Sequence, residues 1–288
     1  MVIVFLHLER EPAAAELLSY WRQVEADTAS ARDVIVSLAA QLRGHPVTMN
    51  ETTTPARSAH RAGQGARAEQ LDDLYPREAT WSTQVTGQRL FAVADGFGGG
   101  EEDAASARAL AALEVLDGSE PGADPLGALD AAFAAGAEAV SHCEGGTTLT
   151  ALLLLADRAL VAHVGDSRVY RVRNGRLERL TRDHTVLQSL VDEGRLTADE
   201  AWADPRRAVL NRAIGQGAAS APDLSVHSLE RGDRFVLTTD GVHGVLESQQ
   251  LADLVVATGD PERIASAVEQ AVLMAGAPDN YGVIVVEA

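Results

Sequence analysis

Three short apolar segments of this sequence each end in an aspartate that is followed by a small residue. They are 92–96 (Ala-Val-Ala-Asp-Gly), 163–167 (His-Val-Gly-Asp-Ser) and 237–241 (Leu-Thr-Thr-Asp-Gly). The end of a strand holds a carboxylate rigidly, and a following glycine lets the backbone or a ligand approach closely. Carboxylates that meet at several strand ends repel one another unless a cation lies between them. The pattern is typical of an all-oxygen site for magnesium, calcium or manganese.

Each of these segments has a simpler structural interpretation when it is taken alone, because Asp-Gly is a common hairpin turn. Asp95 stands out, since residues 95–100 (Asp-Gly-Phe-Gly-Gly-Gly) contain four glycines directly after a predicted buried strand. A turn needs one or two glycines, so this segment indicates close approach of the backbone to a ligand. A further acid, Asp279, lies in Pro-Asp-Asn just before the last predicted strand.

The composition excludes several classes of function. The chain of 288 residues has 42 acidic side chains and a net charge of -18, which argues against a nucleic-acid partner and suits divalent cations. All 24 basic side chains are arginine, which excludes the lysine-dependent chemistry of P-loop NTPases, protein kinases and Schiff-base enzymes. The single cysteine, Cys143, excludes an intrachain disulfide, and we interpret it as a small buried apolar residue in a cytoplasmic protein. No stretch reaches the roughly 18 apolar residues of a membrane span, so we expect no membrane contact.

The pattern of apolar residues divides the chain into three parts. Residues 1–48 predict a helical N-terminal extension, 49–66 a polar linker, and 67–288 a domain of layered α+β type. In this domain strands come in hairpin-like groups and helices in pairs, and Asn174-Gly175 predicts a type I′ hairpin. The predicted strands cover 90–94, 147–155, 159–164, 169–173, 176–181, 235–239 and 283–286, and the predicted helices cover 101–116, 126–140, 251–256 and 261–274.

Seven short motifs follow one another along the domain. They are 93–99 (Val-Ala-Asp-Gly-Phe-Gly-Gly), 145–148 (Gly-Gly-Thr-Thr), 164–170 (Val-Gly-Asp-Ser-Arg-Val-Tyr), 180–184 (Leu-Thr-Arg-Asp-His), 207–215 (Arg-Ala-Val-Leu-Asn-Arg-Ala-Ile-Gly), 239–241 (Thr-Asp-Gly) and 279–280 (Asp-Asn). In this order they resemble the metal-dependent protein serine/threonine phosphatases of the protein phosphatase 2C type, in their bacterial form. The resemblance covers about residues 60 to 288. It implies a four-layer α-β-β-α sandwich, in which two antiparallel sheets are flanked by helix pairs and the acids gather at one edge.

The resemblance also implies roles for the acids at the strand ends. Asp95 would bridge two divalent metal ions, and the carbonyl of Gly96 would help to bind one of them. Asp240 and Asp279 would complete the ligands of the other ion. Asp166 matches the acid of a third, weaker metal site in bacterial members. The implied cofactors are Mn²⁺ or Mg²⁺, two bound tightly and a third more weakly.

The first motif of the family places an arginine five residues before a metal-binding aspartate. Arg67 and Asp72 keep this spacing, although Leu71 replaces the glutamate that precedes the aspartate in the family. A slip of one residue would put Asp73 in the place of Asp72. The resemblance implies that Arg67 holds the substrate phosphate, for which the planar guanidinium offers two parallel hydrogen bonds.

The function implied by the resemblance is the hydrolysis of phosphoserine and phosphothreonine in proteins. Two cations roughly 3.5–4 Å apart would neutralise the phosphate and lower the pKa of a water that attacks phosphorus in line. Expected partners are phosphoproteins, among them serine/threonine kinases and their substrates, in cytoplasmic signalling. Residues 1–48 lie outside the resemblance, and their apolar positions predict self-association or docking.

Two other functions remain open from the sequence. The chain could be a catalytically weak phosphatase-like module that binds a partner, because Leu71, Phe97 and Gly100 depart from the family pattern. It could also be a metal-dependent phosphohydrolase that acts on a small molecule. Phe97 stands where eukaryotic relatives have a histidine and bacterial relatives usually a methionine, and Gly100 stands where bacterial relatives often have a histidine.

The remaining polar motifs have structural interpretations. We expect His163 to be structural, His184 to cap a helix, and His243 to have a small chance of lying near the metals. Residues 186–222 match a variable flap beside the catalytic cleft of the family. The arginines of this region could contact a phosphopeptide or support the fold, and they are Arg195, Arg206, Arg207 and Arg212.

Overall fold

The computed structural model describes residues 56–77, 87–98, 104–215, 218–219 and 221–288. The predicted helical extension over 1–48, residues 49–55 of the predicted linker and Gly100 lie outside these residues.

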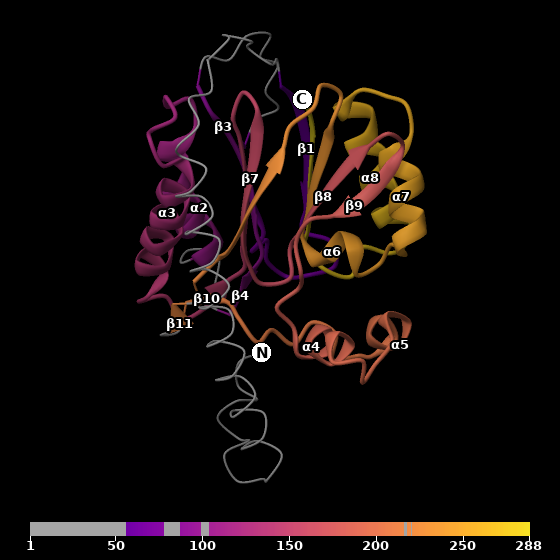
Figure 1. The fold of residues 1–288 in the computed structure, drawn as a ribbon. Coiled ribbons are helices and arrows are strands. Elements are labelled where there is room, and N and C mark those ends of the chain that lie inside the picture. Colours follow the sequence, from indigo (N-terminus) through magenta and orange to yellow (C-terminus); the bar gives the residue numbers. More distant parts are fainter. Residues whose placement is uncertain (1–55, 78–86, 99–103, 216–217, 220) are drawn as a thin grey trace.

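Two five-stranded antiparallel sheets form the centre of the molecule (Figure 1). The first sheet has the order β1-β14-β13-β8-β9, with β1 (Arg57–Gly63), β14 (Tyr281–Glu287), β13 (Arg234–Thr238), β8 (Arg168–Arg173) and β9 (Arg176–Arg179). The second has the order β12-β7-β6-β3-β2, with β12 (Asp223–Ser228), β7 (Arg158–Val164), β6 (Leu149–Leu154), β3 (Arg89–Ala94) and β2 (Asp73–Tyr75). A small sheet has the order β11-β10-β5-β4, with β11 (Ala218–Ala219), β10 (Ile214–Gly215), β5 (Gly146–Thr147) and β4 (Gly96–Phe97).

Helices cover the outer faces of the two large sheets, so the predicted four-layer sandwich is confirmed (Figure 1). The second sheet is covered by α2 (Ala105–Leu113), which continues into the 3₁₀ turn η3 (Glu114–Leu116), and by α3 (Pro125–Val140). The first sheet is covered by α7 (Ser248–Val256) and α8 (Pro261–Met274), and the short α6 (Asp240–His243) follows β13 directly. Two flap helices, α4 (Val186–Asp192) and α5 (Ala198–Ala203), lie beyond one end of the sandwich. Within the described ranges, every helix is too short or too polar to cross a lipid bilayer.

The central strands of the second sheet, β3, β6 and β7, bury both of their faces. In β3, Leu90 and Ala92 pack under α2 and α3, whereas Phe91 and Val93 pack between the two sheets. Successive side chains of a strand point to opposite faces, and a strand buried on both faces becomes apolar at every position. The unbroken apolar run in the sequence therefore reflects helix contact on one face and sheet contact on the other.

The first strand corrects the predicted domain boundary at residue 67. Residues 57–63, which were predicted to lie in the linker over 49–66, form β1 and pair with β14 along the whole strand. The strand has few apolar side chains because it lies at the edge of its sheet, where Arg57 is exposed and His60 and Arg61 are half-buried. Backbone pairing with the apolar β14 holds it in place, and this pairing has no local sequence signature.

Three further predictions, of a strand, a helix and a turn, can be compared with the structure. The strand predicted over 147–155 is divided into β5 and β6, with Thr148 between them. The helix predicted over 101–116 begins, in the described part of the chain, at Ala105. The type I′ turn is confirmed, because Asn174 and Gly175 both have positive φ, 53° and 72°, and join β8 to β9.

Replacement of Phe235 by alanine tests the packing between the sheets. Phe235 is fully buried on β13 in the core that both sheets share. We expect Phe235→Ala to lower the free energy of unfolding by about 3–5 kcal/mol, because the lost contacts leave a cavity. Urea unfolding followed by circular dichroism measures this change. Val226→Ala is the control, since Val226 is 46% exposed and its truncation should change stability by about 0.5 kcal/mol or less. Equal effects of the two substitutions would contradict this account of the core.

Candidate metal centre

Three of the predicted metal ligands lie at one edge of the first sheet. The end of β13, the start of β8 and the start of β14 meet there, because Thr238 pairs with Arg168 on one side and with Val283 on the other. The acids that flank these strand ends are Asp166, Asp240 and Asp279.

The other two acids lie at the corresponding edge of the second sheet. Asp73 at the start of β2 pairs with Ala94 at the end of β3. This register places Asp72 beside Asp95. The two edges meet, since the charges of Asp240 and Asp279 both raise the pKa of Asp72.

Asp72, and not Asp73, belongs to this group of acids. Asp72 is 7% exposed, and the Oδ2 atom of its carboxyl is buried without a hydrogen-bond partner. Asp73 points away and pairs with Arg77 at 2.8 Å. Of the two alternatives left open by the sequence, the structure places Asp72 among the acids and Asp73 beside Arg77.

Burial and mutual repulsion govern the charge state of the acids. Burial is the largest cause that raises the pKa of Asp72 to about 7, although a hydrogen bond to Thr239 works in the opposite direction. Burial also raises the pKa of Asp95 well above its ordinary value, and the charges of Asp72, Asp240 and Asp166 add to this effect. The pKa values of Asp166 and Asp240 are raised too, again mainly by burial. A cation at this position would remove the repulsion and let the carboxyls ionise.

The donor set suits a hard divalent cation. The five side chains offer carboxylate oxygens, the ligands that Mg²⁺ and Mn²⁺ prefer, and the orphaned Oδ2 of Asp72 has an unused lone pair. In the described ranges no group of three or more histidines, cysteines, aspartates and glutamates is gathered closely enough to hold an ion as it stands. The acids meet instead as hydrogen-bonded pairs, Asp95 with Asp72 and Asp95 with Asp240.

Asn280 attaches the loop that carries Arg67 to this edge. Its Nδ2 group donates to the carbonyl oxygens of Gln64 and Glu69, and its Oδ1 atom accepts from the backbone N–H of Leu71, all at 2.8 Å. The side chain is buried. These three bonds bring residues 64–71 next to the start of β14, although more than 200 positions separate them along the chain.

Arg67 lies beside the acids, as its predicted role requires. Its Nη2 atom donates to Oδ2 of Asp279 at 2.5 Å, and its side chain is 60% exposed. The guanidinium therefore stands between the acid cluster and solvent, where it can reach an anionic substrate. The charge of Arg67 also lowers the pKa of Asp240, against the effect of burial.

Gly96 has a packing role that the sequence did not reveal. It pairs with Thr147 between β4 and β5, and a side-chain carbon at Gly96 would come within 2.6 Å of the carbonyl oxygen of Leu71. Only glycine allows the loop after Asp95 to lie this close to the loop before Asp72. The following residue, Phe97, is half-buried.

The histidines serve the structure around the site. His163 is buried and bonds to Thr150 Oγ1 at 2.8 Å, in agreement with its predicted structural role. The prediction that His184 caps a helix is wrong, because Thr185 is the N-cap of α4 and its hydroxyl accepts from the N–H of Gln188. His243 lies close to the acids in sequence but is buried against Thr238 Oγ1, and burial keeps its pKa well below its ordinary value.

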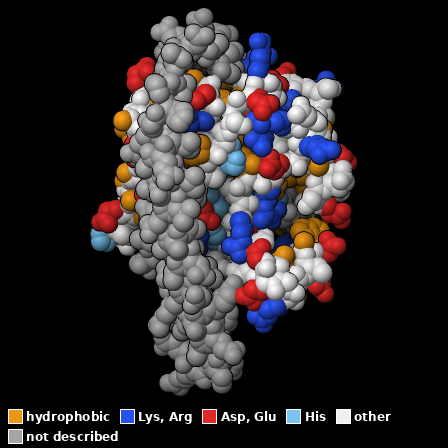
Figure 2. Space-filling model, in the orientation of Figure 1, with side chains coloured by type: hydrophobic (Ala, Val, Ile, Leu, Met, Phe, Trp, Pro, Cys, Tyr) orange, Lys and Arg blue, Asp and Glu red, His pale blue; other side chains and the backbone are white. Residues whose placement is uncertain are grey.

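The arginines of the flap region differ in what they contact. Arg195 pairs with Glu193 and Arg206 with Asp204, both within the flap. Arg212 is buried and pairs with Asp223 at 2.7 Å, which indicates a structural role. Arg207 is exposed and donates to the carbonyl of Gly244 at 3.3 Å, just after α6. Basic side chains gather on the face of the molecule between the sandwich and the flap helices (Figure 2).

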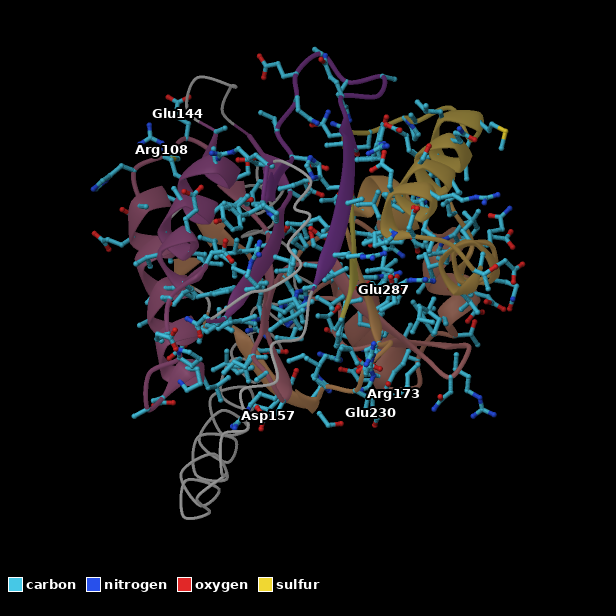
Figure 3. The ribbon with its side chains drawn as sticks, turned by 90° about the horizontal axis from the view of Figure 1, so that it is seen from above. Arg108, Glu144, Asp157, Arg173, Glu230 and Glu287 are labelled. Carbon is cyan, nitrogen blue, oxygen red and sulfur yellow. The ribbon has the colours of Figure 1, made fainter. Side chains whose placement is uncertain are left out.

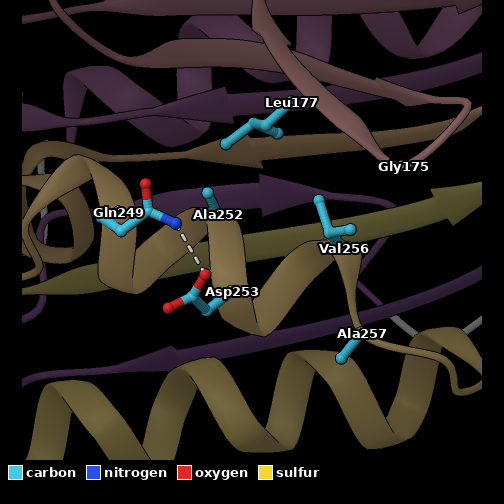
Figure 4. A pocket seen from close by; sticks show the side chains of 7 residues that line it. All are labelled: Gly175, Leu177, Gln249, Ala252, Asp253, Val256 and Ala257. Carbon is cyan, nitrogen blue, oxygen red and sulfur yellow. Dashed lines mark hydrogen bonds between the residues drawn. The ribbon is translucent and has the colours of Figure 1, made fainter.

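Other polar features lie away from the acids. A shallow pocket of about 310 Å³ opens between the β8–β9 hairpin and α7, lined among others by Leu177 and Val256, and contains no predicted site residue (Figure 4). Arg173 bonds to Glu230 and Asp233 at the opposite end of β8 from Asp166 (Figure 3). This ion-pair network ties the hairpin to the loop before β13.

Comparisons with known proteins agree with this fold. Residues 57–281 match the sequence profile of the family described as protein phosphatase 2C, and the chain belongs to this family. The serine/threonine protein phosphatase PstP of Mycobacterium tuberculosis is 37% identical over 249 residues, which are 83% of this chain and 46% of PstP. Protein phosphatase PhpP of Streptococcus pneumoniae is 36% identical over 110 residues, which are 38% of this chain and 45% of PhpP. The chain thus spans about half the length of these curated relatives.

Solved structures show the same architecture. The crystal structure of Mycobacterium tuberculosis PstP/Ppp has a TM-score of 0.73 and 35% identity, with 81% of this chain and 99% of that chain covered. The catalytic domain of PstP in complex with two manganese ions has a TM-score of 0.70 and 36% identity, with 81% and 98% covered. The family suggested by the sequence motifs is confirmed.

The raised pKa of Asp72 predicts how the stability of the metal-free protein depends on pH. The folded protein holds this proton more tightly than the unfolded chain, whose aspartates have an ordinary pKa of 3.8. Stability from the protonated carboxyl is therefore complete below about pH 4 and is lost as the pH rises to about 7. Urea unfolding in EDTA should show a decline over this interval that Asp72→Asn reduces. Parallel pH profiles of the wild type and the variant would contradict the assignment.

Proposed function

We propose that this chain is a protein serine/threonine phosphatase that depends on Mn²⁺ or Mg²⁺. The observation that carries the proposal is the meeting of five aspartates from both sheets at one edge, next to the exposed guanidinium of Arg67. The names of the relatives and the two manganese ions in the structure of the PstP catalytic domain support it.

In this proposal, different aspartates hold different metal ions. Asp95, which is within reach of Asp72, Asp240 and Asp166, would hold the two tight ions, and the Gly96 carbonyl would help to hold one of them. Asp72, Asp240 and Asp279 complete these sites, and Asp166 serves the weaker third ion. Bound metals supply positive charge that neutralises the phosphate and lowers the pKa of an attacking water.

Arg67 binds and orients the substrate phosphate. Its guanidinium donates to the Asp279 carboxylate, and a planar guanidinium can equally donate two parallel bonds to phosphate oxygens. A phosphate that arrives between the metals and solvent thus meets Arg67 at the exposed side of the site. Asn280 keeps the Arg67 loop in place for this contact.

The substrates are phosphoserine and phosphothreonine proteins, among them serine/threonine kinases and their substrates in the cytoplasm. The open, exposed setting of Arg67 favours a phosphorylated segment of a protein over a small molecule enclosed by the site. Self-association or docking through residues 1–48 belongs to the same proposal and is tested by comparing the oligomeric state of the full chain with that of a chain that begins at Met49.

Removal of a single metal ligand tests the proposed activity. We expect Asp95→Asn to reduce Mn²⁺-dependent hydrolysis of a phosphothreonine peptide by at least about 10²-fold, because the amide lacks the charge that holds the ions. Asp253→Asn is the matched control, since Asp253 is an exposed acid on α7 that bonds to Gln249. Full activity of Asp95→Asn would overturn the metal assignment. Faster hydrolysis of nucleotides than of phosphopeptides by the wild type would overturn the protein substrate.

Replacement of Arg67 separates substrate binding from metal binding. Arg67→Ala should lower kcat/KM by about one to two decades, since a charge-assisted hydrogen bond is worth roughly 1.5–3 kcal/mol. Its affinity for Mn²⁺ should not fall, because a guanidinium does not bind a cation and Arg67 pairs with the proposed ligand Asp279. Arg176→Ala, at an exposed position at the far end of the hairpin, controls for the loss of one positive charge. Equal losses of metal affinity and of kcat/KM would show that Arg67 does not act on the substrate.

A further inference from the structure

Thr148 is buried between β5 and β6 and bonds to both backbone groups of Asp95. Its N–H donates to the carbonyl oxygen of Asp95 at 2.9 Å, and its hydroxyl oxygen accepts from the N–H of Asp95 at 3.0 Å. The side chain of Thr148 is 1% exposed. The backbone of Asp95 is therefore held by this residue through two polar contacts, one of which needs the hydroxyl.

The same hydroxyl also reaches the neighbours of Asp166. Thr148 Oγ1 lies 2.8 Å from Ser167 Oγ, and Ser167 is fully buried. On the other side of Asp166, Gly165 has a φ of 112°, and a side-chain carbon there would come within 2.5 Å of Thr148 Cβ and Cγ2. The methyl group of Thr148 thus lies against Gly165, the residue before Asp166. Its hydroxyl bonds to Ser167, the residue after Asp166.

His184 holds this turn from the opposite side. Its ring Nδ1 atom accepts from the backbone N–H of Gly165 at 3.0 Å, and the backbone N–H of His184 donates to the Gly165 carbonyl at 2.7 Å. Its Nε2 atom bonds to Asp223 at 3.0 Å. His184 therefore binds both the N–H and the carbonyl oxygen of Gly165. On the side of the turn that faces Asp95, Ser167 bonds to Thr148.

These contacts join two acids that belong to different strands. Asp95 follows β3 and Asp166 follows β7, and β6 lies between these strands in the second sheet. The Thr147 hydroxyl also donates to the carbonyl oxygen of Asp95, at 3.0 Å. Only the Thr148 hydroxyl, of these two, bonds both to Asp95 and to Ser167. The Thr148 hydroxyl therefore links the backbone of Asp95 to the residue after Asp166, in addition to the pairing of β3 and β7 with β6 and the bond from Thr150 to the Ser167 carbonyl.

We propose that Thr148 is a positioning residue that fixes Asp166 relative to Asp95 and thereby sets the affinity of the third metal site. The inference rests on the proposed function, in which Asp95 serves the two tight ions and Asp166 serves the weaker one. Asp95 is held by further backbone pairing around β3 and β4, so loss of the hydroxyl moves Asp166 more than it moves Asp95. The weaker ion should respond first.

Mn²⁺ binding to the full chain, measured by titration calorimetry without substrate, tests the proposal. Thr148→Val keeps the shape and removes the hydroxyl, and it should weaken the weakest Mn²⁺ site about tenfold while the tight sites change by less than about twofold. Thr148→Ser keeps the hydroxyl and should restore the weak site. Ser167→Ala breaks the link on the Asp166 side alone and should reproduce the effect, which keeps the test decisive if Thr148→Val fails to fold.

Thr181→Val is the matched control. Thr181 is buried and its hydroxyl also accepts a backbone N–H, from Val169 at 3.1 Å, yet it does not touch Asp95. It should lose stability without a selective change at the weak site. Unchanged weak-site affinity in both Thr148→Val and Ser167→Ala, in a wild type that binds Mn²⁺ and dephosphorylates peptides, would overturn this inference alone. A wild type that binds no Mn²⁺ would overturn it together with the proposed function.

Discussion

The mutual repulsion of buried and half-buried carboxylates is the constraint on which this structure depends. Two sheets deliver five aspartates to one edge, and burial with neighbouring charge raises the pKa of several of them. Such a group is unfavourable unless protons or cations neutralise it. The apolar core between the sheets supplies the stability that offsets this cost, because it fixes the strand ends on which the acids stand. The aspartates proposed to bind the metals are therefore also residues that lower the stability of the fold.

Hydrogen bonds behind the acids determine how much this repulsion can distort the site. Asn280 ties the Arg67 loop to the start of β14, and Thr148 ties the end of β3 to the turn after β7. Both side chains are buried, so their hydrogen bonds are hard to exchange for water and costly to lose. These bonds therefore limit how far the acids can move apart.

The sequence predicted those features whose cause is local. The apolar run over 90–94, the acids that follow the strands, and the turn at Asn174-Gly175 each have a local signature, and the structure contains all of them. The features that the sequence did not predict depend on distant partners. Strand β1 is polar and exists through its pairing with β14, and Asn280 acts on residues more than 200 positions away. The choice between Asp72 and Asp73 also needed the register of β2 with β3, because either aspartate fits the motif.

Anomalous diffraction from crystals of the full chain soaked in Mn²⁺ tests the central claim most directly. The anomalous signal of manganese locates each ion independently of any assumption about its ligands. The account predicts two strong peaks in contact with the Asp95 carboxylate, one of them also touching Asp240 and Asp279, and a weaker peak at Asp166. Peaks remote from these aspartates, or no peak beside Asp95 at a saturating concentration of Mn²⁺, would contradict it.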